Sequence, residues 1–367
     1  GTCPERKRKK ALRRTPTAAE AKATSRSQQL VYMSEENEAR VRGRGLAATP
    51  KDLLGYRFLY DEWGSSEYDA ASGPPYYLFD GEKQLVADCS AALVDQLDVT
   101  SLVDLGCGSG AKIVPLLRAF VAKKGTFRYV PVDQSRAFLD IVTANIRESV
   151  PGIVVDGVQA SYRDEAALTQ RGDGGVLYAM FGSEICCQNA DEETSIFKLL
   201  RALRHVMGPE DHVAFAIDPF QTPEVHCGSY DGRESHAWFQ HVVVGLGKAF
   251  RHELLPDDFE YVPRWETGLR QQAPWSAGVV HWLKSKKAFR LTHPDDGTFF
   301  DVRENELLFM LQSAKVTPAE FTDLLASCGF QSSCPAFQND RMCLLTFAAY
   351  EGAATTEDLT MMMLPEE

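Results

Sequence analysis

Three glycines at alternate positions, Gly106, Gly108 and Gly110, lie where a short apolar run meets a helical pattern. Glycine tolerates positive φ and leaves room for a ligand to approach the backbone closely. Residues 102–105 have the composition of a buried strand, and the apolar spacing over residues 111–121 predicts a helix. Strand, glycine turn and helix together are typical of the first unit of a nucleotide-binding α/β fold.

The spacing of this turn distinguishes between two cofactors. In dinucleotide-binding turns the third glycine follows the second by three residues, whereas here it follows by two. With Asp104 ahead of the first glycine, the order acid-x-Gly-x-Gly-x-Gly is the pattern of S-adenosylmethionine (SAM) methyltransferases. Asp133 ends the next apolar run, near the offset at which such folds present a carboxylate to ribose hydroxyls. We therefore predict that Asp104, the three glycines and Asp133 bind SAM, although Asp133 also suits a helix N-cap.

Strand-like and helix-like segments alternate over residues 80–218, which predicts a parallel, doubly wound sheet. Ligands of such sheets bind beyond the carboxyl ends of the strands. The alternation of strand-like and helix-like segments is interrupted over residues 219–317, a segment too long for a connecting loop. We predict an α/β fold, a class I SAM methyltransferase sheet with an inserted, mixed α+β substrate domain. The remaining segments are predicted to be a disordered basic tail (1–28), the N-terminal part of the substrate domain (29–79), a return to the methyltransferase domain (318–350) and a flexible tail (351–367).

Charge and cysteine usage exclude several classes of protein. The chain has a net charge of -12, yet residues 1–45 carry 12 Lys/Arg against 5 Asp/Glu, so the body is strongly acidic and repels nucleic acid. No apolar run reaches the roughly 20 residues of a membrane span, and no secretory signal is recognisable. The nine cysteines form no C-x-x-C pair and the eight histidines no H-x-x-x-H motif. We predict a cytoplasmic monomer without metal, nucleic-acid or membrane partners, whose partner is a small-molecule amine.

Further motifs lie on both sides of the glycine turn. They are Leu59-Tyr-Asp-Glu-Trp-Gly-Ser65, Pro75-Tyr-Tyr77, Tyr129-Val-Pro-Val-Asp133, Phe181-Gly-Ser183 and Lys315-Val-Thr-Pro318. With these, residues 50–350 resemble the histidine-specific SAM-dependent Nα-methyltransferases of ergothioneine biosynthesis, a family that also includes the dimethylallyltryptophan N-methyltransferases of ergot-alkaloid synthesis. The resemblance implies that SAM is held by Tyr60, Gly106, Lys112 and Asp133, with Ser161 and Tyr162 flanking the adenine. It also implies that one of Tyr76 and Tyr77 faces the substrate amine, and that Gly182 and Tyr230 line the substrate site.

Two residues depart from the histidine-binding pattern of these relatives. Cys187 stands where they carry an Asn for the amino-acid carboxylate, unless an insertion brings Gln188 or Asn189 to that place. Leu311, two residues before Ser313, stands where they carry a Glu for the imidazole. An unpaired imidazole N–H in a closed site costs about 1–3 kcal/mol. These losses predict an aromatic amine or amino acid other than histidine as substrate. The alternatives are a histidine methyltransferase with substitute anchors and a non-catalytic SAM-fold binding protein.

Methyl transfer from a sulfonium is an in-line displacement that needs no protein nucleophile. The enzyme must hold a neutral amine lone pair roughly 3–3.5 Å from the methyl group and exclude water. Hydroxyl groups and a carboxylate can orient the amine and receive its proton. We predict the orienting role for Tyr76 or Tyr77 and for Tyr230. Glu184 is predicted to hold the cationic amine product, with a solvated loop acid as the alternative. Gly182, Cys187, Leu311 and Ser313 are predicted to line the substrate site.

Overall fold

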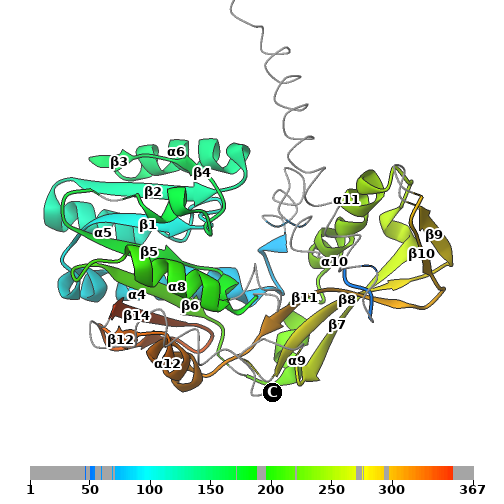
Figure 1. Ribbon diagram of the computed structural model, residues 1–367. Helices are drawn as coiled ribbons and strands as arrows, with labels where there is room; N and C mark the ends of the chain where they lie inside the picture. The colour runs from blue at the N-terminus through cyan, green and yellow to red at the C-terminus, as the bar shows by residue number, and fades with distance from the viewer. Residues whose placement is uncertain are drawn as a thin grey trace, which may run out of the picture.

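The computed structural model describes most of the chain between residues 71 and 349. The described residues are 46, 50–53, 59, 68, 71–170, 172–187, 196–219, 221–269, 275, 277–292 and 297–349. Figure 1 shows two groups of elements, a broad sheet flanked by helices and a smaller group of twisted strands with short helices.

The broad sheet has nine strands in the order β12-β14-β6-β5-β1-β2-β3, with β13 added to β14 and β4 to β2. Strands β1, β2, β3, β5 and β6 run parallel, whereas β14 runs antiparallel to β6. The bounds are β1 (Val99–Leu105), β2 (Phe127–Asp133), β3 (Ile153–Val155), β4 (Val158–Gln159), β5 (Gly175–Met180), β6 (His212–Ile217), β12 (Phe330–Ser332), β13 (Phe337–Gln338) and β14 (Cys343–Ala349). The predicted α/β fold class, a doubly wound sheet, is confirmed.

Helices cover both faces of this sheet, which is why its central strands are buried along nearly their whole length. Every residue of β5 is buried. Successive residues of β1 point to opposite faces of the sheet, so Leu102 packs in one apolar cluster and Val103 in the other. One cluster includes α4 (Tyr77–Gln96), α5 (Val114–Lys124) and α6 (Arg136–Ser149); the other includes α7 (Glu165–Leu168), α8 (Ile196–Val206) and α12 (Pro318–Ser327).

The second group of elements lies between β6 and α12 in the chain. It contains α9 (Pro223–Ser229), α10 (Arg233–Gln240), α11 (Val242–Ala249) and two antiparallel sheets, one with the order β11-β8-β7 and one pairing β10 with β9. These strands are β7 (Phe259–Thr267), β8 (Ala277–Ser285), β9 (Phe289–Thr292), β10 (Phe299–Val302) and β11 (Leu307–Ala314). Asp52, from the amino-terminal part of the chain, forms a bridge with Phe309 of β11.

Helix α4 begins at the two adjacent tyrosines. Tyr76 is its N-cap residue, and the helix runs from Tyr77 with Leu78, Glu82 and Leu85 on its buried face. The predicted boundary at residue 80 therefore lies inside this helix, because the Gly-Pro-Pro turn ends directly at the N-cap. The division into a methyltransferase domain and a substrate domain otherwise stays a prediction.

Candidate active site

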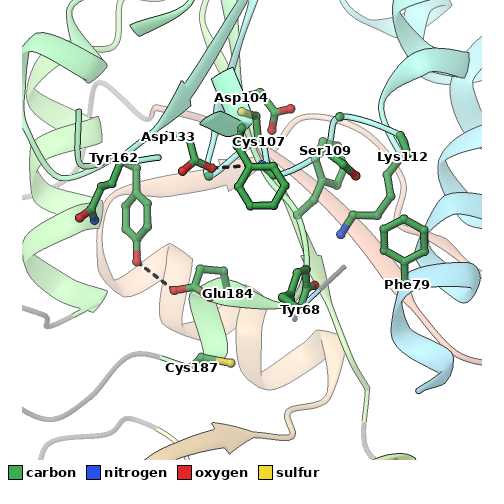
Figure 2. A pocket seen from close by; sticks show the side chains of 18 of the residues that line it. Tyr68, Phe79, Asp104, Cys107, Ser109, Lys112, Asp133, Tyr162, Glu184 and Cys187 are labelled. Atoms are coloured by element: carbon green, nitrogen blue, oxygen red, sulfur yellow. Dashed lines mark hydrogen bonds between the residues drawn. The ribbon is translucent and has the colours of Figure 1, made fainter. Parts of the chain in front are cut away.

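One cavity brings together residues from both groups of elements. On its sheet side it is lined by the glycine turn after β1, by Asp133 at the end of β2 and by Tyr162. On its other side it is lined by Tyr230, Trp238, Phe239, His281, Leu311 and Ser313. Figure 2 shows the sheet side of this cavity, with Glu184 pointing into it.

The three glycines of the turn have different structural roles. All have positive φ, with values of 81°, 51° and 70° at Gly106, Gly108 and Gly110. A Cβ on Gly106 or Gly108 would meet nothing closer than 3.8 Å, so these two leave an open floor to the cavity. A Cβ on Gly110 would lie 2.2 Å from a methyl group of Val142 in α6. Gly110 is thus required for packing of the turn against α6, and the first two glycines give a ligand its close approach.

Asp133 lies at the rim of this floor with two of its acceptor positions already used. Its Oδ2 accepts from the backbone N–H of Gly108 at 3.2 Å and its Oδ1 from that of Ser135 at 2.9 Å. Burial raises the pKa of Asp133. The N-cap of α6 is Ser135, which accepts from the Phe138 N–H at 3.3 Å. A carboxylate has about four acceptor positions, so Asp133 fits two further hydroxyl donors such as those of a ribose.

Asp104 is buried beneath the turn. Its Oδ2 accepts from the Tyr129 hydroxyl at 2.7 Å, and only 2% of its surface is exposed. Burial raises the pKa of Asp104 to about 7. It borders the cavity, but its hydrogen bond faces the protein interior and stabilises the strand ends rather than the open floor.

Lys112 and Gly182 are joined by a residue that the sequence did not single out. Glu82, fully buried on α4, accepts from the backbone N–H of Gly182 at 2.6 Å and forms an ion pair with Lys112. Burial lowers the pKa of Lys112, yet the Glu82 carboxylate outweighs burial and the pKa is raised overall. The sequence signal was an acid on the buried face of an amphipathic helix.

The two residues predicted to flank the adenine behave differently. Tyr162 lines the cavity and its hydroxyl donates to Oε1 of Glu184 at 3.0 Å (Figure 2). Ser161 is not among the lining residues, because its hydroxyl caps the local turn by accepting from the Arg163 N–H at 3.3 Å. Its neighbour Ala160 lines the cavity in its place. Tyr60 lies outside the described residues.

The two adjacent tyrosines at the start of α4 also lie in different surroundings, one at the cavity and one away from it. Tyr76 lines the cavity, and its ring lies 5.4 Å from that of Tyr230. Tyr77 does not line it; its hydroxyl lies 3.0 Å from Asp218 Oδ1 and 2.9 Å from His226 Nδ1. Successive residues at a helix start point in different directions, so only one of the two reaches the cavity.

The predicted acceptor-side residues Gly182, Glu184, Cys187, Tyr230, Leu311 and Ser313 all line the same cavity. Burial raises the pKa of Glu184 and raises that of Cys187 to about 12. Gly182 and Ser183 both adopt positive φ, at 78° and 55°, which turns the chain sharply after β5 and directs Glu184 into the cavity. Such φ is uncommon for serine and marks a constrained turn.

Several lining residues carried no motif in the sequence. Tyr68, Phe79 and His281 border the cavity, as do Trp238 and Phe239. Aromatic side chains are ordinary core residues, so only the fold distinguishes these five from the rest. Among the described residues, no cluster of three or more His, Cys, Asp or Glu could hold a metal ion, and no helix has both the length and the apolar character to cross a bilayer.

The strand order with β14 reversed beside β6, the open glycine floor and the carboxylate at the end of β2 define a SAM-dependent methyltransferase. A family model described as histidine-specific, SAM-dependent methyltransferase matches residues 39–347. The chain belongs to this family, it is an enzyme, and its cofactor is SAM.

Two curated relatives are similar over most of their length. The histidine N-alpha-methyltransferase of Mycobacterium tuberculosis is 25% identical over 234 residues, 63% of this chain and 71% of that protein. The protein of the same name from Mycolicibacterium smegmatis is 23% identical over 292 residues, 79% of this chain and 87% of that protein. A solved SAM-dependent methyltransferase from Clostridium acetobutylicum covers 78% of this chain and 98% of its own, at a TM-score of 0.40 and 10% identity.

The prediction of a substrate other than histidine is wrong. The family is histidine-specific by its description, and both relatives carry histidine in their names. The prediction rested on the departures at Cys187 and Leu311, two positions within a resemblance that covers residues 50–350. The cytoplasmic location and the monomeric state stay predictions.

Proposed function

We propose that this chain is a histidine Nα-methyltransferase, which transfers methyl groups from SAM to the α-amine of histidine. The observation that carries the proposal is a single cavity lined by the glycine turn and Asp133 on one side and by Glu184, Tyr230 and Ser313 on the other. Cofactor and acceptor thus have adjoining places, as an in-line transfer requires.

On the cofactor side, the roles follow from the free hydrogen-bonding positions. Asp133 accepts from ribose hydroxyls, and Gly106 and Gly108 leave room above the turn. Lys112, next to Gly182, offers a positive charge to the carboxylate of the cofactor's amino-acid part. Tyr162 lies against the adenine. When bound, SAM supplies an electrophilic methyl group on its sulfonium.

On the acceptor side, the amine must arrive as a neutral lone pair. We assign its orientation to Tyr76 and Tyr230, whose rings lie 5.4 Å apart at the cavity wall. Glu184 is half-buried, and its raised pKa suits a group that takes up a proton from the amine. Its Oε1 already accepts from Tyr162, which holds the carboxylate in place.

The α-carboxylate of histidine requires hydrogen-bond donors in place of the missing Asn. Lys315 is fully buried, pairs with Asp218 and donates to Ser313 Oγ at 3.1 Å. The Tyr230 hydroxyl lies 3.3 Å from the same oxygen. Both lone pairs of Ser313 then accept hydrogen bonds. Its own O–H is left to donate to Cys187 Sγ, 3.7 Å away, or to a ligand in the cavity. We assign this donor, with the Lys315 charge behind it, to the carboxylate.

The test is a methylation screen of the purified chain with SAM and, separately, histidine, tryptophan, tyrosine and phenylalanine. Each transfer adds the mass of one CH₂, and fragmentation distinguishes the α-amine from the ring nitrogens. We expect histidine to be methylated at the α-amine and Glu184→Gln to lower kcat by about 10²-fold or more while SAM still binds. Methylation of another amino acid with none of histidine would contradict the proposal.

A further inference from the structure

His281 is a buried polar residue in the wall of the cavity. It lies in β8 directly opposite Leu311 of β11, so both side chains stand on the same face of the antiparallel sheet. Both line the cavity, and no part of His281 is exposed to solvent. By the family resemblance, Leu311 stands where the relatives carry a carboxylate, and its cross-strand neighbour here is an imidazole.

One ring nitrogen of His281 has a partner and the other has none. Nδ1 lies 2.6 Å from the Tyr261 hydroxyl. Nε2 is buried and, within the described part of the chain, has no hydrogen-bond partner. A buried polar atom without a partner costs about 1–3 kcal/mol, so such an atom at a cavity wall calls for a ligand.

The Tyr261 contact selects the tautomer of His281. His281 Nδ1 is the only hydrogen-bond partner of the Tyr261 hydroxyl among the described residues. If Nδ1 carried the hydrogen, the phenolic O–H would have no acceptor in a buried place. The phenol therefore donates to Nδ1, and the ring hydrogen is on Nε2. His281 thus carries an N–H donor on Nε2, within the layer of side chains that lines the cavity.

The surroundings of the His281 imidazole fix both its orientation and its charge state. Phe239 stacks on it with centroids 4.5 Å apart, and Tyr230 meets it at 88° with centroids 4.7 Å apart. Burial, and then the Lys315 charge, hold the pKa of His281 well below its ordinary value. The imidazole therefore remains neutral and donates through one fixed N–H.

We propose that His281 is the residue that recognises the acceptor side chain, its Nε2–H donating to the unprotonated ring nitrogen of a neutral imidazole. This rests on the proposed function. The His281 donor on β8 thus takes the place of the carboxylate acceptor that the relatives carry on β11. The bound imidazole must therefore adopt the tautomer whose unprotonated ring nitrogen faces the Nε2–H of His281. Indole and phenyl rings have no lone pair in the ring plane and leave the His281 donor unpaired.

Two variants of His281 and one of a different histidine test this. His281→Met removes the donor at similar volume and is expected to raise the KM for histidine by roughly 5- to 150-fold, with kcat changed far less. His281→Gln retains an N–H donor and is expected to recover part of the loss. His212→Met is the control, because His212 begins β6 away from the cavity and its Nδ1 likewise lacks a partner among the described residues. SAM binding by calorimetry is expected to be unchanged in all three.

A pH series adds a readout that a structural role would not move. Imidazolium has no lone pair, so lowering the pH from 7.5 to 5.5 is expected to raise the KM for histidine roughly tenfold relative to a triazole analogue that stays unprotonated. Tyr261, Tyr230 and Lys315 face His281, and all have raised pKa values. His236 packs against Tyr261 from α10. The titrations of Glu184 and Asp104 at the cavity affect both substrates and cancel in the ratio of the two KM values.

The outcomes are separable. A wild-type enzyme that methylates histidine, together with a His281→Met variant that keeps its KM for histidine, would overturn the inference alone. A KM ratio that does not change with pH would do the same. A wild-type enzyme that does not methylate histidine would overturn the proposed function and this inference with it.

Discussion

The carboxylate of Glu82 and the backbone N–H of Gly182 are hydrogen-bonded at 2.6 Å, although they are separated by 100 positions in the chain. The contact fixes the turn after β5 against α4, and the other Glu82 oxygen pairs with Lys112 at the end of the glycine turn. One buried acid thereby ties together three segments that border the cofactor and acceptor sides of the cavity.

Replacing Glu82 by Gln should therefore be costly. The variant leaves the Lys112 ammonium without its counter-charge, and breaking a buried pair in this way costs about 3–5 kcal/mol. We expect a lower free energy of unfolding and weaker SAM binding, measured by chemical denaturation and calorimetry. Asp301→Asn, which breaks an exposed pair with Arg290, is the control and should leave both quantities nearly unchanged. Equal effects of the two variants would contradict the role given to Glu82.

The glycine turn allows a matched pair of alanine variants. Gly110→Ala places a Cβ 2.2 Å from Val142 and should destabilise the fold, seen as a lower unfolding temperature. Gly108→Ala meets no neighbour and pays only the strain of positive φ, about 1–2 kcal/mol. Its main expected effect is weaker SAM binding, because the added methyl narrows the open floor. A Gly110→Ala protein as stable as Gly108→Ala would show that α6 moves away freely.

The adjacent tyrosines should separate activity from stability. Tyr76→Phe removes a hydroxyl that lines the cavity and hydrogen-bonds with Tyr68, and is expected to lower kcat/KM for methylation by a larger factor than Tyr77→Phe does. Tyr77→Phe removes a buried partner of Asp218 and His226 and should cost about 1–3 kcal/mol of stability. Steady-state kinetics and urea denaturation of both variants decide the matter. The reverse pattern would assign the amine-facing role to Tyr77.

Asp104 predicts a pH dependence of stability. Its pKa is raised from 3.8 to about 7 in the folded chain, so the folded state binds more protons between these values and stability falls as the pH rises through this window. Asp104→Asn keeps an acceptor for the Tyr129 hydroxyl without the buried charge. It should be more stable than the wild type above pH 7, by an amount on the order of 4 kcal/mol. The difference should vanish near pH 4 in denaturation curves measured across the range.

Local sequence determined the cofactor side. The strand, the glycine turn and the acid at the end of the next strand are close in sequence, and in a parallel sheet the carboxyl ends of neighbouring strands necessarily meet. Gly106, Gly108 and Asp133 therefore come together by topology alone. The different role of Gly110 did not follow, because it depends on Val142 from the next helix.

Tertiary structure decided the acceptor side. Whether Tyr76 or Tyr77 faces the cavity depends on the direction of α4 from its first turn. The role of Glu82 depends on its contacts with Lys112 and Gly182, which are distant in sequence. The family resemblance implies that Leu311 replaces an acid. It does not show that His281 stands across from Leu311, since antiparallel register pairs residues 30 positions apart. Polar contacts in a closed site depend on such long-range pairing, which is why the motif alone led to the wrong substrate.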